Sequence, residues 1–202
     1  MSKVTLVAVL SAILVMCLAS VAYLLAMKTE GGAGTTAVQT SLDVGGTFTL
    51  TSQDGQKVSS DIYNDKYKLV YFGFTHCPAI CPTELQKIAA ALSLLPEDIT
   101  ANIQPMFISV DPERDTPAVL KDYLPLFGDN FVGFTGSVDE IEKVKKQFRI
   151  YASKVQEEGA TSYTVDHSSY IYFLDKEGKM IDLFNSEDTA QNVADGIRAA
   201  TI

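Results

Sequence analysis

The stretch that decides the fold is KLVYFGFTHCPAICPTELQKIAAAL, residues 68–92. Its first part, Lys68–Phe74, is an apolar run with β-branched and aromatic residues, which is typical of a strand buried inside a sheet. From Pro82, which fits the first helical position, apolar residues recur at helical spacing and predict a helix with one apolar face. These residues are Leu85, Ile88, Ala89 and Leu92. The stretch therefore predicts a strand, a loop with two cysteines, and a helix.

The neighbouring segments extend this unit into a sheet. A second apolar run, Pro105–Val110, follows the helix, and a β-α-β unit of this kind has parallel strands with a right-handed crossover. Before the unit, Gly46–Leu50 and Lys57–Ser60 flank the turn sequence Asp54-Gly55, which predicts a β-hairpin.

The second half of the chain predicts a complementary set of elements. A helix is expected to start at Asp115 or Thr116 with Pro117, and Ser137 is expected to cap another helix. The remaining expected elements are a short strand at 131–134, a hairpin of 169–174 with 179–184, and a closing helix at 188–200. A βαβ half followed by a ββα half is the thioredoxin-like order, so we expect an α/β, thioredoxin-like fold. Its central mixed sheet would be flanked by helices and preceded by the N-terminal β-hairpin.

The N-terminal residues predict a membrane anchor. Residues 4–27 contain no charge and, as a helix, would span about 36 Å, enough to cross a bilayer core of about 30 Å. We therefore expect a transmembrane anchor at 1–28, a flexible glycine-rich linker at 29–41 and a folded domain at 42–202. Cleavage of a signal peptide near Ser20–Ala22 is the alternative.

Charge and cysteine content restrict the function. The net charge of −9 argues against a nucleic-acid partner, which would favour a basic face. Of the three cysteines, Cys17 falls in the expected anchor, so Cys77 and Cys81 alone remain for the domain, too few for a disulfide scaffold. With no Arg-rich presequence, we expect a single-pass protein of the bacterial inner membrane with its domain on the periplasmic or outer face.

The loop between strand and helix carries the chemistry. Cys77 and Cys81 have C-x-x-x-C spacing, which is about one helical turn, so both sulfurs can face the same way. The helix N-terminus stabilises thiolates, and the thiolate is the form that binds soft metals or attacks disulfides. The pair is competent both to bind a metal and to form a disulfide.

A third donor is expected from the loop before the late hairpin. There His167 can complete a site of two sulfurs and one nitrogen, whereas His76, adjacent to Cys77, is expected to point elsewhere. Two thiolates and an imidazole form a soft set that suits Cu(I), while structural zinc prefers four protein ligands. The pattern favours copper and leaves zinc open.

These motifs resemble the Sco/SenC family of copper chaperones for cytochrome c oxidase assembly. The similar stretches are YFGFTHCPAICPTEL (71–85), ISVDPERDTP (108–117), FTGSVDEIEKV (134–144) and TVDHSSYIYFLDKEGK (164–179). The resemblance implies a thioredoxin-like domain that binds one copper ion, Cu(I) or Cu(II), through Cys77, Cys81 and His167. It also implies a copper client, cytochrome c oxidase subunit II or a similar protein, whose binuclear site the family helps to load by metal transfer, by reduction of that site's cysteines, or both.

Two segments need separate interpretation. The family commonly has Asp where this chain has Ala79, which leaves the three ligands intact but puts any role of that carboxylate in doubt. The segment Asp111–Asp115 is either a loop near the site or a docking surface, or a charged strand-to-helix connection; we expect the connection.

The main rival function is a thiol-disulfide oxidoreductase in which Cys77 and Cys81 form the redox-active pair, with a thiol-reducing partner and only secondary copper binding. Such an enzyme would have no need of His167. A peroxiredoxin-like peroxidase is disfavoured because Pro78 stands where that family has Thr or Ser. An assembly scaffold or copper sensor would need the same binding residues as a chaperone.

Overall fold

The computed structural model describes residues 16, 44–156, 158–159 and 161–201. Apart from Met16, the described residues do not include the expected anchor at 1–28 or the expected linker at 29–41. The alternative cleavage site and Cys17 also lie outside them. None of the helices in the described part of the chain has the length and apolarity that a membrane span requires.

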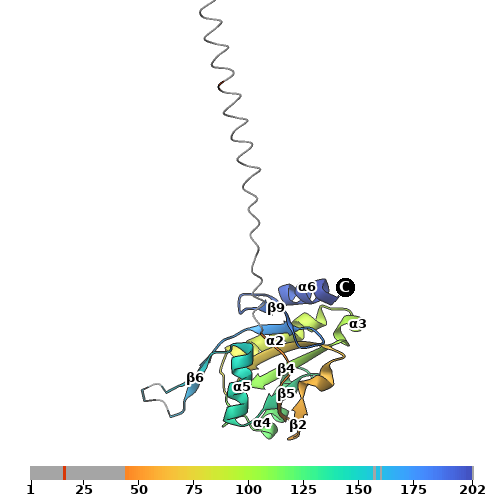
Figure 1. The fold of residues 1–202 in the computed structure, drawn as a ribbon. Coiled ribbons are helices and arrows are strands. Elements are labelled where there is room, and N and C mark those ends of the chain that lie inside the picture. The colour runs from red at the N-terminus through yellow and green to blue at the C-terminus, as the bar shows by residue number, and fades with distance from the viewer. Residues whose placement is uncertain (1–15, 17–43, 157, 160, 202) are drawn as a thin grey trace, which may run out of the picture. The chain divides into compact units, whose positions relative to one another are not determined.

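A mixed sheet forms the centre of the fold (Figure 1). Among the described residues its strand order is β2-β1-β5-β4-β3-β8-β9, with β3 parallel to β4 and antiparallel to β8. The strands are β1 Thr49–Ser52, β2 Lys57–Ser59, β3 Tyr67–Gly73, β4 Ile103–Ser109, β5 Val132–Thr135, β8 Ile171–Leu174 and β9 Met180–Phe184. The predicted β-α-β unit and both predicted hairpins are confirmed.

Helices cover the sheet and are started by the residues that the sequence indicates. The helical segments are η1 Ser60–Tyr63, α2 Ile80–Ser93, α3 Glu97–Thr100, α4 Pro117–Tyr123, η2 Leu124–Leu126, α5 Val138–Phe148 and α6 Ala190–Thr201. Thr116, and not Asp115, caps α4, and Ser137 caps α5 in a reciprocal pair of hydrogen bonds with Glu140.

The two faces of the sheet have separate aromatic clusters. Phe72 on β3 contacts Phe148 of α5, with ring centroids 5.1 Å apart. The adjacent Tyr71 points to the opposite face, because side chains alternate along a strand, and its ring lies 6.4 Å from that of Phe107. The cysteine of α2 packs on this second face, where a Cβ added to Gly73 would lie 2.9 Å from the sulfur of Cys81. Gly73, at the end of β3, therefore leaves the space that the sulfur of Cys81 occupies.

Two local expectations were wrong. Pro82 is the third residue of α2 rather than the first, which is tolerated because the N–H groups of a first turn have no partner within the helix. His167 does not lie in a loop: it ends strand β7, Thr164–His167, which pairs with β6, Ala152–Val155, in a separate two-stranded sheet. Figure 1 shows β6 to the side of the main sheet.

Candidate metal centre

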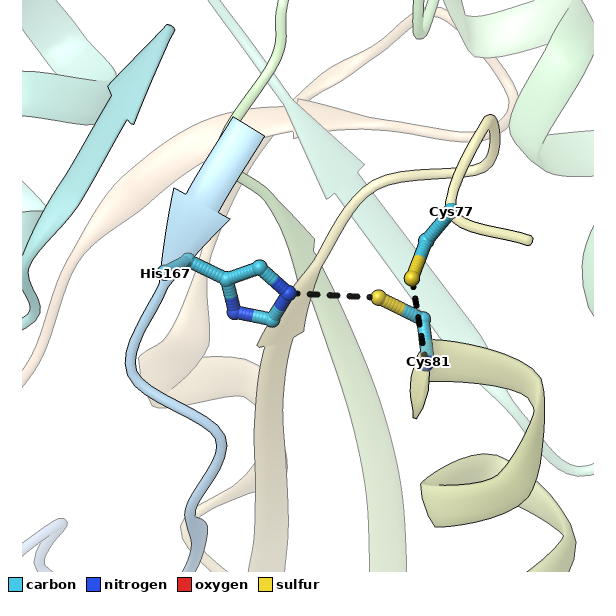
Figure 2. A group of neighbouring side chains, drawn as sticks. All are labelled: Cys77, Cys81 and His167. Atoms are coloured by element: carbon cyan, nitrogen blue, oxygen red, sulfur yellow. Dashed lines mark hydrogen bonds between the residues drawn. The ribbon is translucent and has the colours of Figure 1, made fainter. Parts of the chain in front are cut away.

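The two cysteines and His167 converge at the N-terminal end of α2 (Figure 2). One donor atom from each residue, the two sulfurs and an imidazole nitrogen, lies within 4.8 Å of the other two. The sulfur of Cys81 is 3.3 Å from Nε2 of His167. In the described residues no other histidine, cysteine or carboxylate belongs to this group.

The two thiols have different environments. Cys77 is half-buried, Cys81 is fully buried, and both are free. The hydrogen bond with the Cys81 side chain is the largest cause that lowers the pKa of Cys77, to about 3, and the Cys81 backbone N–H lowers it further. The same bond and the burial raise the pKa of Cys81 far above its usual range. The pair therefore has an accessible thiolate at Cys77 and a buried proton-bearing sulfur at Cys81.

The helix start contributes directly to this asymmetry. The backbone N–H of Cys81, in the first turn of α2, donates to the sulfur of Cys77 at 3.4 Å. Ala79 occupies the N-cap position and has no side chain that could cap the helix. The thiolate of Cys77 therefore accepts a hydrogen bond from a helix N–H that would otherwise donate to a capping side chain.

His167 presents its free nitrogen to the cysteines. Its Nδ1 lies 2.9 Å from the carbonyl oxygen of Ser168, and because a carbonyl only accepts, Nδ1 carries the proton. The lone pair of a neutral ring is then on Nε2, the nitrogen nearest Cys81. The ring packs edge-on against Phe74, with centroids 5.7 Å apart, and against Tyr71 at 6.2 Å. Orientation and tautomer are thus both set for a ligand role.

The other histidine lies outside the donor group. His76 has a half-exposed side chain, and its Nδ1 is 3.1 Å from Oγ1 of Thr75 and 3.8 Å from a carboxylate oxygen of Asp115. It is adjacent to Cys77 in the chain but does not belong to the group of donors formed by Cys77, Cys81 and His167.

Asp115 supports the site, a role that fits the less favoured interpretation of its segment, a loop near the site. Its carboxylate is fully buried and accepts hydrogen bonds from the backbone N–H of Thr75 at 3.0 Å and from the Thr75 hydroxyl at 2.6 Å. The hydroxyl of Ser109 donates a third at 2.6 Å. Asp115 thus ties β4 to the loop that carries Cys77. The segment Asp111–Asp115 is a strand-to-helix connection, as expected, but it also lies beside the site, the alternative that we did not favour, and its two aspartates are buried.

The donor set fits a soft metal ion. Bonds of about 2.0–2.3 Å to three donors require these donors to lie within about 4 Å of one another, so closing on an ion takes less than about 1 Å of movement. A thiolate that is already ionised and an imidazole with its lone pair inward remove most of the protonation cost of binding. Two sulfurs and one nitrogen match Cu(I) better than a harder divalent ion.

Comparison with known proteins gives one family. The model of the family described as SCO1/SenC matches residues 36–201. "Protein sco1" of Schizosaccharomyces pombe is 40% identical over 156 residues, which are 76% of this chain and 59% of that protein. The "SCO2-like protein" of Rickettsia felis is 36% identical, over 78% of this chain and 77% of that one. The chain spans about half the length of several of the curated relatives it matches.

Solved structures agree with this match. The structure of "Arabidopsis thaliana ScoI with copper bound" aligns with a TM-score of 0.71 at 37% identity, over 78% of this chain and 98% of that chain. The structure of BsSco, described as "a member of the Sco family of cytochrome c oxidase assembly proteins" with a "disulfide switch", aligns with a TM-score of 0.58 at 29% identity. That alignment covers 76% of this chain and 91% of that chain. The thioredoxin-like Sco fold of the described domain is therefore confirmed.

Proposed function

The chain belongs to the SCO1/SenC family, and on this premise we propose that it is a membrane-anchored copper metallochaperone. It binds one copper ion, Cu(I) or Cu(II), through Cys77, Cys81 and His167. It passes this copper to the binuclear site of cytochrome c oxidase subunit II or of a similar client.

One observation carries the proposal: a sulfur from the loop before α2, a sulfur from the first turn of α2 and a nitrogen from a distant strand lie within 4.8 Å of one another. A redox pair alone needs no such nitrogen. The tautomer of His167 supports a ligand role, since a purely structural histidine has no need to keep Nε2 free beside a sulfur. The relatives solved with copper bound give independent support.

The asymmetry of the thiols suits reception and release of copper. Cys77 is the accessible thiolate, so it makes the first contact with copper from a donor and the last with copper on its way to a client. Cys81 gives up its proton when the ion binds, because a coordinating thiol is deprotonated. The binding equilibrium therefore includes proton release, mainly from Cys81.

The location is part of the same proposal. The uncharged residues 4–27 anchor the chain in a bacterial inner membrane, and the domain faces the periplasm or the outside. A bacterial source is supported by the rickettsial relatives. A reporter fused after Ile202 that is active only in the cytoplasm would contradict this orientation.

A thiol-disulfide oxidoreductase is the second candidate. It is favoured by the pairing of an accessible Cys77 of low pKa with a buried Cys81 of high pKa, the arrangement of an attacking and a resolving thiol. In this case the chain would reduce the cysteines of the client site, and copper binding would be secondary.

Copper titration of the purified full-length chain distinguishes the candidates. A metallochaperone binds one equivalent in each oxidation state and retains it against an equimolar amount of zinc. The Cu(II) form shows sulfur-to-copper charge transfer and the hyperfine coupling of one nitrogen. Failure to bind stoichiometric copper, together with efficient reduction of a disulfide peptide, would leave the oxidoreductase as the function.

A further inference from the structure

The connection Asp111–Asp115 between β4 and α4 touches both segments that carry metal donors. Asp115 accepts hydrogen bonds from Thr75, two residues before Cys77, as described above. The preceding residue, Arg114, donates a hydrogen bond to the hairpin of β6 and β7, whose last residue is His167. The connection is thus the one described segment with side-chain hydrogen bonds both to the cysteine loop and to the approach to His167.

Arg114 contacts both the backbone and the ring of Tyr163, the residue immediately before β7. Its Nη1 donates to the backbone carbonyl of Tyr163 at 2.9 Å, and its Cζ lies 3.8 Å from the centroid of the Tyr163 ring. The tyrosine hydroxyl donates to Asp111 at 2.8 Å, and Asp111 in turn accepts from Nε of Arg114. The three side chains therefore close a cycle of two hydrogen bonds and a cation–π contact, with a fully buried carboxylate at its base.

A second route joins the same guanidinium to the imidazole. The Cζ of Arg114 lies 5.8 Å from the ring of Phe74, and that ring packs edge-on against His167. The neighbouring strand adds an outer contact, because Lys154 of β6 pairs with Glu113 at 2.6 Å and lies over the Tyr163 ring at 4.8 Å. An isolated two-stranded hairpin is marginally stable, so these contacts decide where its end is held.

We propose that Arg114 is a positioning residue for the nitrogen donor: with Asp111 and Tyr163 it fixes the β6–β7 hairpin so that Nε2 of His167 faces the two sulfurs. The inference rests on the proposed function only in taking His167 as a copper ligand. We call Arg114, Asp111 and Tyr163 the clamp. Because Asp115 and α2 hold the two sulfurs, the clamp positions Nε2 of His167 and leaves the thiol pair in place. Arginine is needed here because its planar fork can donate and stack at once, which lysine cannot do.

The test compares variants of the purified full-length chain. Arg114→Gln removes the charge and the fork, and Tyr163→Leu removes the stacking ring by an independent change. Arg198→Gln is the matched control, because Arg198 also pairs with an aspartate three residues earlier, Asp195, but on α6. Loss of a partner that orients a metal ligand weakens metal affinity by about 10- to 100-fold.

We expect Arg114→Gln and Tyr163→Leu to weaken Cu(II) binding by at least about tenfold and to reduce the single-nitrogen hyperfine coupling. Cu(I) affinity and the number of reactive thiols should change by less than about threefold, because the two sulfurs suffice for Cu(I). Added imidazole should restore part of the nitrogen signal. Circular dichroism and the melting temperature report whether each variant is folded, and the Tyr163 variant decides the matter if Arg114→Gln does not fold.

A metal-free measurement separates this inference from the proposed function. In the metal-free chain, NMR cross-peaks between the rings of Phe74 and His167 should be present in wild type and in Arg198→Gln, and lost in both clamp variants. If wild-type chain binds no copper but these peaks behave as expected, the copper function fails and the clamp stands. Unchanged peaks and Cu(II) spectra in both clamp variants, or equal loss of Cu(I) and Cu(II), would overturn the clamp.

Discussion

Replacement of His167 by alanine tests the central claim, because this residue separates the metal role from the redox role. Cys77 and Cys81 serve both, so their loss decides nothing. His167 supplies one of three donor atoms within 4.8 Å and the sole nitrogen among them. We expect His167→Ala to lose stable Cu(II) binding and oxidase maturation while the thiol pair still cycles between dithiol and disulfide.

The magnitude follows from the number of donors. Structural zinc sites with four ligands bind with about 10–16 kcal/mol, so one ligand contributes about 2.5–4 kcal/mol. Loss of one donor should therefore weaken Cu(II) binding by about 3 kcal/mol, which is roughly two orders of magnitude in Kd. Cu(I) binding should fall less, because soft coordination by two thiolates remains.

The same change has a predictable effect on the thiols. With its proton on Nδ1, His167 donates no hydrogen bond to the sulfur of Cys77, and the largest cause that lowers the pKa of Cys77, the hydrogen bond with Cys81, stays in the variant. The pKa of Cys77 should therefore remain well below that of an ordinary thiol. Because a thiol's pKa affects its redox potential, the potential of the pair has to be measured in each variant.

The assay combines competition titrations in both oxidation states with oxidase activity in copper-limited cells. His167→Phe is one control, since it keeps a ring against Phe74 and Tyr71 without a nitrogen donor, and it should behave like His167→Ala. His76→Ala is the other, and it should bind copper as wild type does. Normal oxidase maturation by His167→Ala in copper-limited cells would refute the chaperone function and favour the thiol reductase.

Three further predictions concern the surroundings of the site. Ala79→Asp should tighten Cu(II) binding more than Cu(I) binding, since a carboxylate favours the harder ion; equal effects on both oxidation states would remove this idea. Asp115→Asn should lower the free energy of unfolding in urea by about 1–3 kcal/mol and weaken the binding of both Cu(I) and Cu(II), because a buried carboxylate that accepts two hydrogen bonds from Thr75 and one from Ser109 loses its charge. A lower free energy of unfolding with unchanged Cu(I) affinity would show that Asp115 does not hold the cysteine loop. Iodoacetamide should label Cys77 at nearly the same rate from pH 6 to pH 8, whereas an ordinary thiol slows by about tenfold per pH unit below its pKa; preferential labelling of Cys81 in mass spectra would contradict the assignment of the thiolate.

Much of the fold follows from local sequence. The run Lys68–Phe74 is too apolar to lie anywhere but in a buried strand, and it forms β3 almost residue for residue. Ser137 with Glu140 caps α5 where the sequence indicates, and Asp54-Gly55 turns the first hairpin. These features depend on backbone preferences and on side-chain periodicity within one element, so neighbouring residues suffice to predict them.

The burial of charged and polar residues follows less directly from local sequence. The segment Asp111–Asp115 has the composition of a solvated loop, yet both aspartates are fully buried and bonded to partners such as Thr75 and Tyr163. Burial of a carboxylate is stable only when several donors from other segments reach it. No periodicity within the loop reports such donors, so a position beside the site was considered for this segment but not favoured.

The amino-acid sequence alone identifies which residues could bind a soft metal, because thiols near a helix start and a histidine have that chemistry wherever they lie. The tertiary structure decided that they converge. Cys81 and His167 are 86 residues apart, and their contact depends on the packing of Cys81 against Gly73 and on the hairpin that ends at His167. The physical reason is that many long-range contacts together bring the donor atoms to one site. The residues that make these contacts do not bind metal, so their types give no sign of where the site will form.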